Sequence, residues 1–255
     1  MPRIKPVAHD EQLSLVDHLD ELRSRLMFIL LAFGVAFAVC GWQNKFILEV
    51  VNRPLPDSHD QPLTFGVTEP FTTTFTNAAY AALLIALPVI LYHVYAFLLP
   101  AFSPTEKRVA KPLMLMVPAL FVAGVAFCYF VVLPPATSFL LEFNASEFNT
   151  QVRARDYYSF ATLTMLAMGL GFQVPVFILA LVRLNIVTVE QLRRNRRYAV
   201  LVIAIVASLL PTIDPITMLL EMVPLLILYE LSILLAARIG RSAAEPREFA
   251  AAESS

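Results

Sequence analysis

The chain has 255 residues, of which 58% are hydrophobic and 15% charged, with a mean hydropathy of +0.69 and a formal net charge of −1. A soluble domain carries about 25% charged residues, so the deficit and the long apolar runs indicate an integral membrane protein. The balanced charge gives no indication of a nucleic-acid partner.

The cysteines and histidines do not form a recognisable ligand set. Cys40 and Cys128 each lie inside an apolar run and do not form a C-x-x-C motif, so we predict neither a disulfide framework nor a zinc site. The four histidines are scattered without metal-binding spacing: His9, His18, His59 and His93. We therefore expect no metal and no cofactor.

The N-terminal residues 1–25 are polar and amphipathic. Leu13, Val16, Leu19 and Leu22 recur every three residues, which predicts a helix that could lie at the membrane surface. The apolar run that follows resembles the core of a signal peptide, but several acidic residues precede it, whereas signal peptides begin with a short basic stretch. We interpret this run as an uncleaved first span.

The hydropathy pattern predicts an all-α membrane protein with six transmembrane helices in a single domain, residues 1–238. The predicted spans are 26–44, 78–97, 112–133, 157–182, 198–211 and 216–237, joined by polar or proline-containing connections. Residues 70–77 are uncharged but too polar for hydrocarbon, so the second helix is expected to begin outside the bilayer. Residues 239–255 are rich in Ala, Glu and Ser, which predicts a disordered cytoplasmic tail.

Basic residues mark the cytoplasmic side of a multi-spanning protein. Of the 19 lysines and arginines, 15 fall in the N-terminal segment, the connections after spans two and four, and the tail. The four on the other side are Lys45, Arg53, Arg153 and Arg155. Both termini are therefore predicted to be cytoplasmic, in a bacterial inner membrane.

Prolines and span lengths predict the shape of the bundle. Four spans contain a proline, which kinks a helix, and the kinks together suggest a cupped, concave bundle: Pro88, Pro118, Pro175 and Pro224. The fifth apolar run, residues 198–213, rises only about 24 Å at 1.5 Å per residue, against a hydrocarbon core of about 30 Å. We hypothesise that spans five and six thin the bilayer beside them.

Two motifs at the predicted cytoplasmic face place a glutamate beside basic residues. They are His18-Leu-Asp-Glu-Leu-Arg-Ser-Arg25 and Phe97-Leu-Leu-Pro-Ala-Phe-Ser-Pro-Thr-Glu106-Lys-Arg108. One interpretation is local ion pairing, with Glu21 and Arg25 at i, i+4. The other is an acidic patch for a cationic ligand, for which arginine is suited because its planar fork pairs with carboxylates.

Three polar residues fall within the predicted spans: Gln173, Glu221 and Glu230. Such groups are costly at membrane depth and are commonly functional. Glu221 and Glu230 are nine residues apart and so face opposite sides of a helix. We expect Glu221 to snorkel toward the periplasm, Glu230 to find a partner inside the bundle or on a second protein, and Gln173 either to satisfy backbone freed by Pro175 or to contact a partner.

Several segments in order resemble the TatC family, the receptor subunits of the twin-arginine protein translocase. The resemblance runs from about Asp17 to Arg238 and includes the two glutamate motifs. Five further segments contribute: Ala86-Leu-Pro-Val-Ile-Leu-Tyr-His-Val-Tyr-Ala-Phe97, Tyr129-Phe-Val-Val-Leu-Pro134, Phe172-Gln-Val-Pro175, Leu192-Arg-Arg-Asn-Arg-Arg-Tyr198 and Leu228-Tyr-Glu230.

The resemblance implies a receptor that binds twin-arginine signal peptides at its cytoplasmic face. It implies work with TatA- and TatB-like single-span proteins, in an oligomeric complex that exports folded proteins with the proton-motive force. The residues that match the family's signal-peptide site are Glu21, Glu106, Arg23, Phe97 and Arg108. Pro88 and Asp214 match structural positions. The chain departs from many relatives at Gln173, where they carry glutamate, and at Glu221, where an apolar residue is usual.

Two other classes of function compete with the receptor role. A proton-coupled small-solute transporter with Glu230 as proton carrier is the alternative, although the chain has no internal repeat. An intramembrane enzyme would need a nucleophile with a base at membrane depth. Ser208 and Thr217 are available, but no histidine or aspartate matches their depth, so we predict a protein that is not an enzyme.

Overall fold

The structure is a computed structural model that describes residues 9–56, 61–98, 104–148, 150–183, 186–208 and 214–252. Within these ranges the side chains of 9–18, 98, 104–114 and 239–252 are not included. The described residues are almost entirely helical, and they form no strand beyond an isolated bridge between Leu63 and Arg153.

The first helix, α1 (His9–Trp42), runs without a break through the amphipathic N-terminal segment and the first predicted span. It contains no proline, so nothing interrupts its ladder of hydrogen bonds. Residues 9–25 are therefore helical, as the sequence predicts, but they continue the helix of the span and do not lie along the membrane surface.

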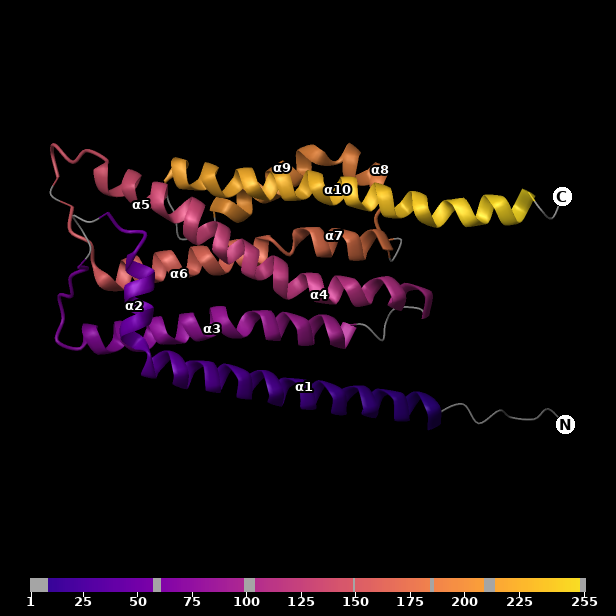
Figure 1. Ribbon diagram of the computed structural model, residues 1–255, viewed down its shortest axis with the longest axis horizontal. Helices are drawn as coiled ribbons and strands as arrows, with labels where there is room; N and C mark the ends of the chain where they lie inside the picture. Colours follow the sequence, from indigo (N-terminus) through magenta and orange to yellow (C-terminus); the bar gives the residue numbers. More distant parts are fainter. Residues whose placement is uncertain are drawn as a thin grey trace.

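A short helix, α2 (Asn44–Asn52), follows α1 where the sequence suggested a loop, and it lies across the end of the bundle (Figure 1). Hydroxyl groups hold it in place. Tyr129 donates to the carbonyl of Val50 at 2.7 Å and Tyr157 donates to that of Val51 at 2.6 Å. These bonds reach carbonyls in the last turn of α2, of which that of Val50 also accepts from the backbone N–H of Arg53 at 3.3 Å.

The next two rods are α3 (Glu69–Leu98) and a composite of α4 (Pro104–Phe127), a π-helical turn η3 (Cys128–Val132) and α5 (Leu133–Glu142). Pro134 and Pro135 explain the π turn, because neither can donate the backbone hydrogen bond that an unbroken α-helix requires. The same prolines suit the first turn of α5, where no partner is needed. The third rod thus continues past residue 133, where the sequence predicted its end.

The described residues of the second half of the chain form one broken rod and three further helices. The rod consists of α6 (Ala154–Gly171) and α7 (Val174–Arg183), with the break just before Pro175. The connection predicted as a basic loop holds α8 (Val189–Arg194), whose Thr188 and Gln191 form a capping box. It is followed by α9 (Arg196–Ser208) and α10 (Pro215–Ala252).

The last helix continues through most of residues 239–255, the predicted disordered tail. Ala, Glu and Arg favour a helix in this stretch, whereas Gly240 and Pro246 oppose it.

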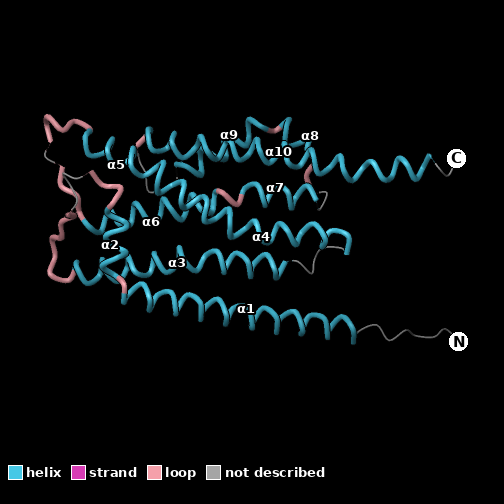
Figure 2. Tube along the Cα trace, in the orientation of Figure 1, coloured by secondary structure: helices cyan, strands magenta, loops and turns pink. Residues whose placement is uncertain are grey.

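The long rods lie side by side along the long axis of the molecule (Figures 1 and 2). The start of α1 and the end of α10 lie at one end of the bundle, which we call the terminus end. We call the opposite end, where α2 lies, the α2 end. Helix α1 packs mainly against α3, α3 against α4 and α6, and α10 against α7 and α9. The row therefore has α1 at one edge and α9 with α10 at the other.

Within the described residues, five helical segments are long and apolar enough to cross a membrane. They are Leu19–Trp42, Glu69–Phe97, Leu115–Glu142, Ala154–Arg183 and Pro215–Arg238. In the most apolar 18-residue stretch of Leu19–Trp42, only 6% is buried inside the protein. The corresponding share for Ala154–Arg183 is 50%. The apolar surface of α1 therefore requires lipid around it. Helix α9 covers residues 198–208 of the fifth predicted span, whose remaining residues fall outside the described part of the chain.

Candidate functional site

The predicted signal-peptide site lies at the terminus end of α1, α3 and α4 (Figure 1). Glu21 is close to the start of the apolar part of α1, Phe97 is one residue from the end of α3, and Glu106 is the third residue of α4. Cys40 packs in one cluster with Ala78 and Ala82, and Phe28 contacts His93 with ring centroids 4.8 Å apart. This antiparallel register sets Glu21 level with the end of α3.

Glu21 is bound by an arginine of its own helix. The Oε1 atom of Glu21 accepts hydrogen bonds from Nε of Arg25 at 3.0 Å and from Nη2 of Arg25 at 2.5 Å. The Glu21 side chain is 36% exposed and that of Arg25 is 24% exposed. The i, i+4 ion pair is therefore present, and the carboxylate is held at a partly open surface.

The other residues of the predicted site are only partly described. Arg23 is exposed on α1 and Phe97 is half-buried on α3. Glu106 and Arg108 lie in the first turns of α4, but their side chains fall outside the described residues. The structure thus brings the helices of all five residues to one end of the bundle.

Gln173 lies at the break between α6 and α7 and is 8% exposed. Its backbone N–H bonds to the carbonyl of Leu170 at 2.9 Å, three residues back, which frees the carbonyl of Gly169. The Gln173 side-chain amide donates to that carbonyl at 3.4 Å and to the carbonyl of Val117 on α4 at 3.2 Å. It therefore supports the kink and also ties α4 to the break.

The two glutamates of α10 have opposite environments. Glu221 is fully buried, at 0% exposure, so it does not snorkel as the sequence suggested. Glu230 is 47% exposed and its Oε2 accepts a hydrogen bond from Nη2 of Arg196 at 2.7 Å. The partner of Glu230 is thus Arg196 of this chain, on the first turn of α9. Glu221 and Glu230 face opposite sides of α10, as their spacing of nine residues predicts.

Of the two predicted structural residues, Asp214 has a local role that its hydrogen bond defines. Pro88 lies inside α3. Asp214 immediately precedes Pro215 at the start of α10, and its Oδ1 accepts a hydrogen bond from the backbone N–H of Thr217 at 2.7 Å. Asp214 therefore caps the N-terminus of α10, with proline at the favoured first position.

Two features escaped the sequence analysis. Gly124 of α4 and Gly169 of α6 allow close contact of the two helices. A Cβ atom added to Gly124 would lie 2.7 Å from the carbonyl oxygen of Met168, and one added to Gly169 would lie 2.6 Å from the ring of Phe121. A pattern of small residues within apolar spans was the available signal. The other feature is an ion pair between Glu69 and Arg153, which no local pattern reveals.

The fold and the site define a class: an all-helical, multi-pass membrane protein with a partly exposed Glu21–Arg25 pair at the terminus end of its bundle. Comparison with known proteins identifies the family. The chain matches the family model for the Sec-independent protein translocase protein (TatC) over residues 17–224, and it belongs to this family.

Curated relatives and a solved structure are similar to this protein over most of its length. The Sec-independent protein translocase protein TatC of Carboxydothermus hydrogenoformans is 33% identical over 241 residues, 94% of this chain and 97% of that protein. The chloroplastic TATC of Arabidopsis thaliana is 33% identical over 89% of this chain and 67% of its own length. A crystal structure of the twin-arginine translocase receptor TatC in DDM aligns with a TM-score of 0.75 at 33% identity, covering 86% of this chain and 99% of that one.

Family membership establishes the general role of the chain. It is a multi-pass component of a Sec-independent protein translocase, and it acts in a translocase complex with other Tat components. The family consists of translocase components and not of enzymes.

Proposed function

We propose that this chain is the signal-peptide receptor of a twin-arginine translocase in a bacterial inner membrane. Glu21 and Glu106 each bind one of two adjacent arginines in a signal peptide, at the cytoplasmic surface. Six spans place both termini in the cytoplasm. TatA- and TatB-like single-span proteins complete the complex, which exports folded proteins with the proton-motive force.

The observation that carries this proposal is the pair between Glu21 and Arg25. A guanidinium donates two hydrogen bonds to a half-exposed carboxylate at the membrane boundary. The site therefore already presents a geometry that binds arginine. An arginine of a signal peptide would compete with Arg25 for Glu21, so the resident arginine also screens the carboxylate when no peptide is bound.

The surroundings of Glu21 suit the remainder of such a peptide. Phe97 is half-buried at the end of α3, and exposed apolar residues such as Leu26 and Leu30 follow Glu21 along α1. An apolar stretch after the paired arginines can lie along this surface within the bilayer. The two charged contacts give specificity more than strength, because exposed ion pairs are weak individually.

Site-specific photocrosslinking tests the receptor role. A photoreactive residue at position 21 or 106 is tested against a signal peptide with Arg-Arg and against the same peptide with Lys-Lys. We expect labelling by the first that weakens with the second, because lysine lacks the fork of arginine. A probe at Lys45, at the α2 end, is the matched control. Equal labelling of both peptides at 21 and 106 would contradict the proposal.

The small-solute transporter is less well supported. It requires Glu230 to pick up and release protons, whereas Glu230 is paired with Arg196 at 2.7 Å. Uptake of a solute by vesicles that contain this chain alone would favour the transporter.

A further inference from the structure

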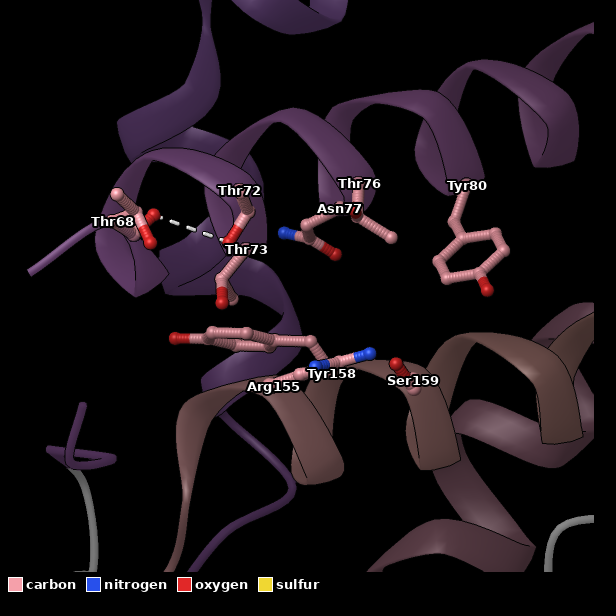
Figure 3. Close-up of a pocket in the computed structure, with 9 residues that line it drawn as sticks. All are labelled: Thr68, Thr72, Thr73, Thr76, Asn77, Tyr80, Arg155, Tyr158 and Ser159. Atoms are coloured by element: carbon pink, nitrogen blue, oxygen red, sulfur yellow. Dashed lines mark hydrogen bonds between the residues drawn. The ribbon is translucent and has the colours of Figure 1, made fainter. Parts of the chain in front are cut away.

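A polar pocket of about 410 Å³ opens between the first turns of α3 and α6, at the α2 end (Figure 3). It lies far along the bundle from the glutamates of the proposed signal-peptide site. Thr73, Asn77 and Tyr80 extend into it from α3 and face Arg155, Tyr158 and Ser159 of α6. Its size falls in the range of small-molecule sites.

The floor of the pocket holds polar groups that the protein does not satisfy. Asn77 is 1% exposed, and neither its Nδ2 nor its Oδ1 has a hydrogen-bond partner among the described residues. The hydroxyl of Thr73, on the same face of α3, is 7% exposed and also lacks one. Buried polar groups are nearly always hydrogen-bonded, so these groups indicate a bound partner from outside the chain.

The charge of the pocket specifies an anionic partner. Arg155 is the only charged side chain among the nine residues that line the pocket. Within the described part of the chain Arg155 has no ion pair. Arg153, two residues before it, is paired with Glu69. An arginine surrounded by hydroxyls and an amide offers donors to phosphate oxygens and repels cations.

The depth of the pocket corresponds to the lipid headgroup layer. Its lining on α3 falls largely within the polar residues before position 78, where the hydrocarbon span is predicted to begin. Exposed aromatic side chains cluster at the same end of the bundle, as in an interfacial belt: Trp42, Phe65, Phe71 and Phe75.

The two helices become apolar immediately below the pocket. On the same face of α3, Leu83 and Leu87 follow Tyr80 at helical spacing. On α6, the partly buried Leu163 follows Ser159 by one helical turn. A ligand with a phosphate in the pocket would thus have an apolar track for hydrocarbon chains.

We propose that this pocket binds the phosphodiester headgroup of a membrane phospholipid from the leaflet at the α2 end. Arg155 pairs with the phosphate, Asn77 and Thr73 bond to headgroup oxygens, and the acyl chains lie along α3 and α6. The headgroup oxygens accept the hydrogen bonds that Nδ2 of Asn77 and the hydroxyl of Thr73 lack, and the lipid fills the space between the two helices.

Native mass spectrometry of the purified full-length protein tests this site, with phosphatidylglycerol as the probe. We expect Arg155→Gln to lower the affinity for this lipid about tenfold, because it removes a charge-assisted contact. Lys45→Gln removes one exposed positive charge at the same end without touching the pocket, and it should leave binding unchanged. Thr73→Val tests the floor of the pocket, with thermal unfolding used to verify that each variant is folded.

Two further experiments distinguish a lipid phosphate from free inorganic phosphate as the ligand. Inorganic phosphate at millimolar concentration should not displace the lipid, and dioleoylglycerol, which lacks the phosphate, should not bind there. Binding to Arg155→Gln as tight as to the unchanged protein would overturn the proposal. So would an equal loss with Lys45→Gln, or full displacement by inorganic phosphate.

Discussion

The carboxylate of Glu69 accepts a hydrogen bond from Nε of Arg153 at 2.6 Å and joins the first turn of α3 to the start of α6. The same carboxylate accepts from the backbone N–H groups of Phe65 at 2.8 Å and Gly66 at 3.1 Å. The bridge between Leu63 and Arg153 continues this link, with the N–H of Leu63 donating to the carbonyl of Val152 at 2.7 Å. The hydrogen bond to Glu69 raises the pKa of Arg153. The Glu69 side chain thus connects the start of α3, the segment before it and the start of α6 at the α2 end.

Replacing Glu69 with alanine should lower the thermal unfolding midpoint, because it leaves Arg153 and two backbone donors without their acceptor. Glu49→Ala is the matched control, since Glu49 pairs with Arg53 at 3.5 Å on an exposed surface, at 69% and 63% exposure. Such a pair is worth about 0–1 kcal/mol, so the control should change little. The measurement is thermal unfolding in one detergent, and equal midpoints for the two variants would argue against this connecting role of Glu69.

Gly124→Ala should destabilise the contact between α4 and α6. Its new Cβ would lie 2.7 Å from the carbonyl oxygen of Met168 and 2.9 Å from the Cα of Gly169, and backbone atoms cannot move aside cheaply. Overpacking of this kind costs about 1–3 kcal/mol. The free energy of unfolding in mixed micelles measures this cost.

Gly34→Ala on α1 supplies the comparison, because its added Cβ meets nothing within 4 Å. Alanine is the better helix former by about 1 kcal/mol, so this variant should be neutral or slightly stabilised. Equal destabilisation of both variants would mean that the close approach of α4 and α6 is not what Gly124 provides.

The apolar spans and the local glutamate pair were predictable from sequence, because both depend on residues close together along the chain. Hydropathy identified the rods, and i, i+4 spacing identified Glu21 with Arg25. Helix α2 was missed because its nine residues lie among charged positions, and α5 was missed because Pro134 and Pro135 suggest a loop. In fact both prolines occupy the first turn of a helix.

Long-range contacts could not be predicted. Glu69 and Arg153 are 84 residues apart, and each alone suggests only a charged loop. The pocket between α3 and α6 was equally hidden, although the polar residues 70–77 were recognised as unsuited to hydrocarbon. These residues form a pocket only because α6 packs against the same face of α3, and the sequence does not show which helix packs there. For Glu106 and Arg108 the prediction stands on sequence, since their side chains fall outside the described residues.

Asp214→Ala should destabilise the protein by about 1 kcal/mol, the usual cost of losing a helix N-cap. The reason is the hydrogen bond from the Thr217 N–H to the Asp214 carboxylate at 2.7 Å, which the alanine cannot accept. Asp214→Asn is the informative comparison, because asparagine caps about as well as aspartate. A loss in stability or export that asparagine does not restore would show that the charge of Asp214 matters beyond capping.

Glu21→Gln should weaken binding of a twin-arginine peptide about three- to tenfold. The substitution removes a charge-assisted hydrogen bond, and the partial exposure of Glu21 to solvent reduces the contribution of that bond. Asp20→Asn, the adjacent exposed carboxylate, should have little effect and controls for charge at the surface. Titration of a labelled peptide into the protein in nanodiscs measures both affinities. If the two substitutions weaken binding equally, the site is a diffuse acidic surface and not a defined pair of carboxylates.

Arg25→Gln gives a prediction of opposite sign at the same carboxylate. It removes the resident guanidinium that donates to Glu21 at 3.0 and 2.5 Å, so a peptide arginine no longer has to displace it. Affinity for the twin-arginine peptide should therefore rise, and discrimination against Lys-Lys should persist because it depends on the fork of the ligand. The same titration, with Arg238→Gln on α10 as control for loss of an exposed positive charge outside the proposed site, decides the matter. Weaker binding by Arg25→Gln alone would mean that Arg25 positions Glu21 for the peptide instead of competing with it.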